Sequence, residues 1–118
     1  MHELSIAEHI VEIALEHLPA NDGATVKEIV LEIGTLSGIE IDALTFAMDV
    51  VMKSTALEHA TLRIDRVQGR ARCDSCAGEF DLADLYSPCP SCGGFGNTVL
   101  RGEEMRVQSI LVEERKKE

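Results

Sequence analysis

The stretch TVKEIVLEI, residues 25–33, decides the fold of this chain. Apolar and polar side chains alternate along it, which is typical of a β-strand with one face in a core. The core face carries Ile29, Leu31 and Ile33, and the opposite face carries Glu28, Val30 and Glu32. Gly34 and Ser37-Gly38 then end the strand, because glycine and serine favour turns.

An amphipathic helix is expected on each side of this strand. Residues 5–8 (SIAE) fit the S-x-x-E capping box, which predicts a helix that begins near Ser5 and leaves residues 1–4 as a short arm. Apolar residues then recur at helical spacing, at Ala7, Ile10, Val11, Ala14, Leu15 and Leu18. Pro19 and the turn at residues 21–23 (NDG) end this helix. A second helix is predicted from about Ile41 to Lys53, with Leu44, Ala47, Met48 and Val51 on its apolar side.

Two further segments alternate as strands, Ala60 to Val67 and Met105 to Val112. The predicted order therefore gives an α+β fold, with two helices packed on a small sheet of about three strands. The block from Arg70 to Gly96 differs, because it is poor in aliphatic residues and rich in Cys, Gly, Pro and Asp. We expect an α+β domain formed by residues 1–69 and 99–118, with a separate four-cysteine module at 70–98 inserted between two strands.

Composition restricts the classes of protein to consider. The 118 residues suit one domain, and 45 % apolar with 27 % charged residues indicate a globular chain. Residues 1–59 hold eleven acidic residues and two lysines, a net charge of −9, so phosphate backbones are poor partners. No apolar run reaches the roughly 18 residues of a membrane helix, and no signal segment opens the chain. We therefore expect a cytoplasmic protein that binds neither membrane nor nucleic acid.

The strongest motif is the spacing C-x2-C-x12-C-x2-C, formed by Cys73, Cys76, Cys89 and Cys92. Two such pairs, each on a tight turn, can meet as a tetrahedron of thiolates, which zinc accepts readily. Glycines at 78, 93 and 94 permit turns that aim backbone N–H groups at sulfur. Four apolar residues are expected to form a small hydrophobic cluster beside the site: Phe80, Leu82, Leu85 and Tyr86. We predict a zinc-ribbon-like module in which zinc has a structural role, and iron remains an alternative.

Other uses of these cysteines fit less well. Disulfides do not suit a chain that lacks a secretion signal, and a thioredoxin-like site would bring one C-x2-C pair. Residues 73–92 contain four acidic residues and no Lys or Arg, which disfavours a nucleic-acid-binding ribbon. Four arginines at 63, 66, 70 and 72 precede the first cysteine without interleaved aromatics, so we interpret them as a solvated strand edge and linker. A closed four-thiolate site leaves no open position for catalysis.

The first three residues, Met1, His2 and Glu3, offer an amine, an imidazole and a carboxylate in succession. The amine, the His2 amide nitrogen and the imidazole can occupy three corners of a square plane, a geometry that suits nickel(II) or copper(II). The alternative is that this histidine is simply exposed. For His9, His17 and His59, we interpret each as a solvated residue rather than a ligand.

Five stretches together resemble the HypA/HybF family of hydrogenase nickel-incorporation proteins. They are MHELSIAEHIVEIA, VLEIGTLSGIEIDALTFAMDVV, CDSCAGEF, CPSCGG and GEEMRVQSILVEE, in that order along nearly the whole chain. The resemblance implies a nickel metallochaperone that is not an enzyme, with nickel as cargo and structural zinc. It implies His2 as a nickel ligand, Met1 and Glu3 as neighbours, and Cys73, Cys76, Cys89 and Cys92 as zinc ligands. Leu4 and Gly94 depart from the family pattern, and neither is a ligand.

The resemblance also implies partners. These are the maturation GTPase HypB and the hydrogenase large subunit, with urease as a possible further beneficiary and the protein itself a monomer or homodimer. No phosphate-binding loop is present in the sequence, so any energy-driven step must come from a partner. The alternative function is a zinc-ribbon adaptor that binds other macromolecules and ignores nickel.

Overall fold

The computed structural model describes residues 3–19 and 23–113. They form two compact units, each assembled from segments that are distant in the sequence. Unit 1 consists of three segments: the described residues up to Leu31, residues Ile39–Ile64, and the described residues from Arg106 onward. Unit 2 consists of Glu32–Gly38 and Asp65–Met105.

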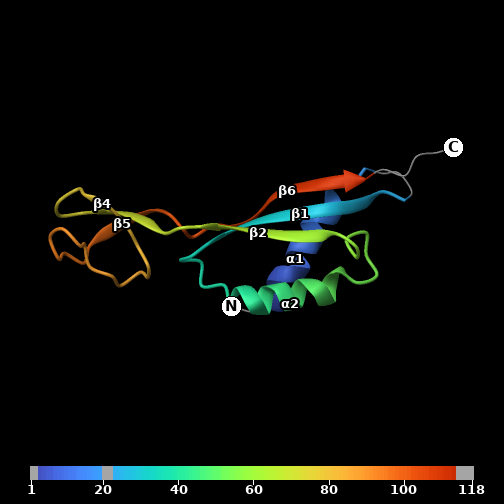
Figure 1. The fold of residues 1–118 in the computed structure, drawn as a ribbon, viewed down its shortest axis with the longest axis horizontal. Coiled ribbons are helices and arrows are strands. Elements are labelled where there is room, and N and C mark those ends of the chain that lie inside the picture. The colour runs from blue at the N-terminus through green and yellow to red at the C-terminus, as the bar shows by residue number, and fades with distance from the viewer. Residues whose placement is uncertain (1–2, 20–22, 114–118) are drawn as a thin grey trace. The chain divides into compact units, whose positions relative to one another are not determined.

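Unit 1 contains both helices and most of a three-stranded sheet. The helices are α1 (Glu3–Glu16) and α2 (Ile41–Met52), and the strands are β1 (Thr25–Gly34), β2 (Thr61–Val67) and β6 (Met105–Glu113). The strand order is β2-β1-β6, and both helices lie on the same side of this sheet (Figure 1). The predicted α+β class and its three strands are confirmed. Neither helix of the described residues is long and apolar enough to cross a membrane.

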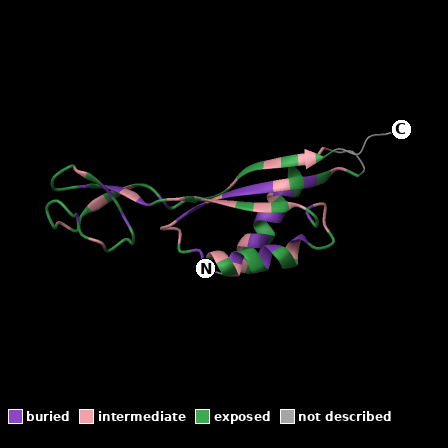
Figure 2. Ribbon diagram, in the orientation of Figure 1, coloured by how far each residue is buried: buried purple, intermediate pink, exposed green. Residues whose placement is uncertain are grey.

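Figure 2 shows buried residues on both helices and on β1 of unit 1. The side chains of this core are aliphatic or methionine. Its buried side chains from the helices are Ala7, Ile10, Val11, Ala14, Leu44, Ala47, Met48 and Met52. In β1, Ile29 and Leu31 are fully buried, as their alternation predicts. Val30, predicted on the polar face, is also buried, at 2 % exposure. The physical reason is that β1 is the central strand, so side chains of two neighbouring strands flank Val30.

The predicted start of the first helix is wrong. Helix α1 already includes Glu3, so Ser5 lies inside its first turn and not at the N-cap. Glu3 and Leu4 therefore belong to the helix rather than to an arm. The Glu3 carboxylate accepts a hydrogen bond from the backbone N–H of Glu40 at 3.3 Å. A carboxylate in the first turn also interacts favourably with the helix dipole, so Glu3 stabilises the earlier start.

Unit 2 contains a second sheet that periodicity does not predict. Its strands are β3 (Arg70–Cys73), β4 (Glu79–Asp81) and β5 (Asn97–Arg101), in the antiparallel order β4-β3-β5. Its buried cluster consists of Ala71, Cys73, Phe80, Leu82 and Cys89. Leu85 and Tyr86, expected in this cluster, are 50 % and 86 % exposed. Two of these five buried residues are cysteines, so only three buried apolar side chains remain in this cluster if no metal is bound.

Three glycines of unit 2 let chain segments approach backbone to backbone. A Cβ on Gly34 would lie 1.8 Å from the carbonyl oxygen of Gly102, and one on Gly69 would lie 2.4 Å from that of Leu82. The same segments are hydrogen-bonded, with the Leu36 N–H donating to Gly102 O at 2.7 Å. Gly34 also donates its N–H to Glu104 O at 2.8 Å. We call Gly34, Gly69 and Gly102 the glycine junction.

We predict that Gly34→Ala lowers the free energy of unfolding by about 3 kcal/mol or more, since the added methyl group meets backbone that cannot move aside. Denaturant unfolding measures this loss. Gly38→Ala is the control: a Cβ there has open space, and its φ of +78° alone should cost about 1–2 kcal/mol. Equal losses in the two variants would contradict the steric explanation.

Candidate metal centre

The four cysteines come together in unit 2. Their sulfur atoms all lie within 4.8 Å of one another, with Cys73 Sγ 3.5 Å from Cys92 Sγ and Cys76 Sγ 3.7 Å from Cys89 Sγ. A tetrahedral site with metal–sulfur bonds of about 2.3 Å has sulfur–sulfur edges of about 3.8 Å. The cluster is thus close to the size of a four-thiolate metal site, and the donor set suits zinc or iron.

The two C-x2-C pairs have the same local structure. In the first, the Cys73 N–H donates to Gly78 O at 2.9 Å and the Ala77 N–H donates to Cys73 O at 2.9 Å. In the second, Cys89 N–H donates to Gly94 O and Gly93 N–H to Cys89 O, both at 2.8 Å. The residue after each second cysteine has a positive φ, +62° at Ala77 and +75° at Gly93. This left-handed residue turns each loop back around its cysteines.

Backbone N–H groups stabilise the first thiolate of each pair. Hydrogen bonds from the backbone of Cys76 and Ser75 lower the pKa of Cys73 to about 7. In the same way, backbone donors of Cys92 and Ser91 lower the pKa of Cys89. These two thiols are also the buried pair of the four. Hydrogen bonding to the charged form therefore outweighs the burial that opposes it.

The second cysteine of each pair is shifted the other way. The Gly94 N–H alone would lower the pKa of Cys92, but the nearby Cys73 sulfur and burial outweigh it and raise that pKa to about 11. For Cys76, the Gly78 N–H likewise lowers the pKa, and the sulfurs of Cys73 and Cys89 together raise it above its ordinary value. Four negative sulfurs at this spacing repel one another, so a cation among them is needed for all four to ionise.

Of the predicted nickel group, the structure describes Glu3. Met1 and His2 lie outside the described residues. The Glu3 carboxylate is held at the start of α1 by the Glu40 N–H, and Glu40 is itself the N-cap of α2. The carboxylate therefore lies where the first turns of both helices meet.

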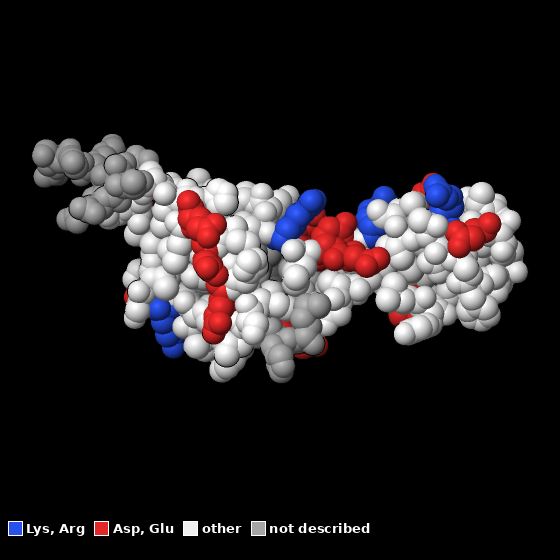
Figure 3. All heavy atoms as spheres, turned by 180° about the vertical axis from the view of Figure 1, so that it is seen from behind, with Lys and Arg blue, Asp and Glu red and all other residues white. Residues whose placement is uncertain are grey.

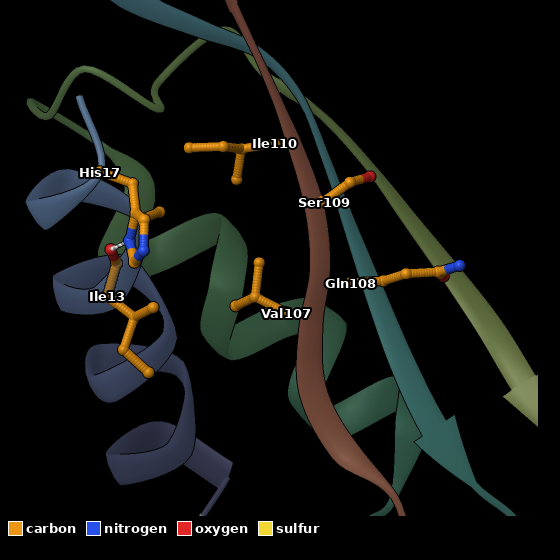
Figure 4. Close-up of a pocket in the computed structure, with 7 residues that line it drawn as sticks. Ile13, His17, Val107, Gln108, Ser109 and Ile110 are labelled. Carbon is orange, nitrogen blue, oxygen red and sulfur yellow. Dashed lines mark hydrogen bonds between the residues drawn. The ribbon is translucent and has the colours of Figure 1, made fainter. Parts of the chain in front are cut away.

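The remaining histidines are exposed, as expected. His59 Nε2 lies 3.4 Å from a carboxylate oxygen of Glu58. His17 donates from Nδ1 to Ile13 O at 2.8 Å and lines a groove of about 220 Å³ between α1 and β6 (Figure 4). In this groove Val107 and Ile110 point toward α1, while Gln108 and Ser109 point away. Among the described residues, the four cysteines are the one cluster of metal-binding side chains.

Sequence reasoning missed two features of these sites. Ala77 adopts a left-handed conformation, where glycine would be expected. It follows the second cysteine of the first pair, as Gly93 follows the second cysteine of the other pair. The contact of Glu3 with Glu40 spans 37 residues and has no local signal. The first could have been found by aligning the two C-x2-C pairs with each other.

A family model described as "Hydrogenase/urease nickel incorporation, metallochaperone, hypA" matches residues 1–112. The hydrogenase maturation factor HypA of Geotalea uraniireducens is 46 % identical over 113 residues, which cover 96 % of this chain and 100 % of that protein. The HypA of Parabacteroides distasonis is 43 % identical over 112 residues, or 95 % of this chain and 97 % of its own length.

Two solved structures share the fold. The solution structure of the Ni metallochaperone HypA from Helicobacter pylori superposes with a TM-score of 0.63 at 24 % identity, covering 93 % of this chain and 96 % of that one. A structure titled "Solution structure of HypA protein" gives a TM-score of 0.65 at 24 % identity, covering 93 % and 94 %.

We predict that Cys76→Ser, or removal of metal by a chelator, unfolds unit 2 and leaves α1 and α2 folded. The cluster of unit 2 depends on two of the cysteines, whereas unit 1 has an aliphatic core of its own. Amide NMR spectra measure the two units separately, and Ser91→Ala, at an exposed serine inside the second pair, is the control. Well-dispersed unit 2 signals in metal-free protein would contradict the prediction.

We also predict that metal binding at about pH 7.5 releases at least about two protons, those of Cys76 and Cys92, whose pKa values are raised. Protons compete with the metal, so affinity should fall as the pH is lowered from about 8 to 6 and rise on return. Calorimetry in buffers of different ionisation enthalpy counts the protons. Uptake of metal without proton release would show that these thiols are already ionised.

Proposed function

The chain belongs to the hydrogenase/urease nickel-incorporation family of metallochaperones, and we propose that it binds Ni²⁺ through Met1, His2 and Glu3. It is a maturation factor and not an enzyme. The bound nickel is cargo for delivery to nickel–iron hydrogenase during its maturation. Urease, which the family description names, is a second candidate recipient.

The observation that carries this proposal is the family match, which begins at residue 1 and so includes the three proposed nickel groups. The chemistry of the two donor sets supports it. A four-sulfur site is closed and holds its metal from all sides, which suits a structural ion. An amine and an imidazole on one short segment favour nickel and leave other coordination positions for a receiving protein.

Protonation gives this nickel site a means of release. Binding needs a neutral amine, whose ordinary pKa is about 7.7–8.0, and a neutral imidazole, at about 6.5. Affinity therefore falls as the pH drops. The Glu3 carboxylate accepts a hydrogen bond from Glu40, the N-cap of α2. This contact would hold Glu3 in place while nickel binds and leaves.

We assign Zn²⁺ to Cys73, Cys76, Cys89 and Cys92, where the sulfur spacing fits its tetrahedral preference. The ion would neutralise the thiolates and complete the small core of unit 2. It supplies no chemistry beyond this. Iron fits the same donors, and the colour and absorption of the purified protein separate the two metals, because zinc–thiolate sites are colourless in the visible range.

The proposed partners are those of hydrogenase maturation, namely the GTPase HypB and the hydrogenase large subunit. The family match and the similar HypA proteins support a role in hydrogenase maturation, and neither names these two partners. We place the delivery in the cytoplasm, since four free thiols need a reducing compartment.

The alternative function is a zinc-ribbon adaptor that binds other macromolecules without nickel, and the described contacts disfavour nucleic acid as its partner. Arg70 donates to Asp81 at 2.8 Å and lies 3.9 Å from Glu79, and Arg63 lies 3.8 Å from Glu28. These arginines are thus already paired within the chain. Phosphate groups would have to displace carboxylates to reach them.

We predict that His2→Ala weakens nickel binding by at least about a hundredfold and leaves zinc content unchanged, because it removes a ligand and not a structural residue. Nickel titration by calorimetry on untagged protein measures this, and zinc is quantified by elemental analysis. His9→Ala is the control, since His9 is an exposed histidine on α1.

Unchanged nickel affinity in His2→Ala would reject the assigned site. The amine is tested separately by adding one residue ahead of Met1. The extension moves the terminal amine nitrogen out of the chelate ring and should weaken nickel binding while the fold is retained.

A further inference from the structure

Helix α2 carries two apolar stripes, and the core uses one of them. The buried stripe consists of Leu44, Ala47, Met48 and Met52, of which Ala47 also belongs to the second stripe. The other consists of Ala43, Phe46, Ala47 and Val50, at the i, i+3, i+4 and i+7 positions of one helix face. Ala47 is the buried floor of this second stripe, whereas Phe46 is 72 % and Val50 47 % exposed.

The second stripe lines a groove of about 390 Å³ together with Glu3 and Leu4 of α1. Leu4 is 50 % exposed, so the α1 side of the groove is apolar and accessible as well. Leu4, Phe46 and Val50 thus line one groove, and exposed apolar residues that lie together indicate a binding surface more strongly than the same residues scattered singly. Apolar residues on two neighbouring helices are the kind of lining that binds the apolar face of an amphipathic helix.

Acidic residues border this groove. Asp42 and Asp49 lie one turn before and one turn after Phe46 on α2, and Glu8 follows Leu4 by one turn on α1. All three are exposed. Lys53, after the end of α2, is the basic residue nearest in sequence. Asp and Glu side chains form a row on the face of the molecule that Figure 3 shows.

We propose that this groove docks an amphipathic helix of a partner protein, with an apolar stripe that covers Phe46 and Val50 and with Lys or Arg residues along both flanks. The acidic border selects the basic flanks. It also disfavours two other occupants: a second copy of this chain would bring like charges together, and an anionic membrane would be repelled.

The inference rests on the proposed function in one respect: Glu3 both lines this groove and belongs to the proposed nickel group. A helix in the groove would thus lie against the residue that follows His2. Docking would place the partner beside the nickel ion, where it can offer ligands of its own.

The test uses a labelled helical peptide of about 18 residues, with leucines at i, i+3, i+4 and i+7 and lysines on both flanks, and zinc-loaded protein. Fluorescence anisotropy should show binding that weakens as salt is raised. Phe46→Ser should weaken binding about tenfold or more, since it removes the central anchor. Val50→Ser should also weaken it, and Leu111→Ser, at an apolar residue of β6 that is 54 % exposed, should not.

Three results would overturn the docking proposal: equal binding to Phe46→Ser and wild type, equal binding of a peptide with glutamate flanks, or sedimentation showing a wild-type dimer that Phe46→Ser converts to monomer. The last would make the groove a surface for self-association. Nickel titration of Phe46→Ser should give wild-type affinity. If Phe46→Ser loses peptide binding, the docking proposal is supported even when His2→Ala still binds nickel. The docking proposal and the nickel-site proposal can therefore be rejected independently.

Discussion

Four sulfur atoms within 4.8 Å of one another impose the constraint on which unit 2 depends. Backbone N–H groups can stabilise one thiolate in each C-x2-C pair, and the pKa values of Cys73 and Cys89 are lowered accordingly. The same charges raise the pKa values of Cys76 and Cys92. A divalent cation resolves this conflict, and its binding free energy becomes part of the stability of the unit.

The two units are stabilised by different means. Unit 1 buries aliphatic side chains from both helices and the central strand, which is sufficient for a core without aromatic residues. Unit 2 has short strands and five buried residues, two of which are cysteines. The glycine junction at Gly34, Gly69 and Gly102 lets the chain segments of unit 2 approach more closely than any side chain would permit.

This difference suits a carrier of metal ions. A site closed by four sulfurs retains its ion, so it is suited to structure and unsuited to delivery. The nickel site that we propose at Met1, His2 and Glu3 has few ligands from this chain, so it could gain others from another protein. The groove that we propose as a docking surface, lined by Ala43, Phe46, Ala47 and Val50 of α2, also includes Glu3. Cargo and docking surface would then belong to the same pair of helices.

The sequence by itself determined the local elements. Period-two alternation marked β1, β2 and β6, helical spacing marked α1 and α2, and the cysteine spacing marked two metal-binding turns, because each pattern is contained in a few consecutive residues. The cysteine spacing predicted zinc with iron as the alternative, and the N-terminal donors suited nickel or copper. Family resemblance then singled out nickel at Met1, His2 and Glu3, of which the structure describes Glu3 alone.

Tertiary structure decided what depends on residues distant in the chain. The contact between Glu3 and Glu40 stabilises a helix that begins before Ser5. Strand pairing forms a second sheet from segments of three to five residues, which are too short to show a period in the sequence. Tertiary structure also decided which apolar stripe of α2 is buried. A pattern reports that side chains are apolar, but whether they face a core or solvent depends on which elements pack against them.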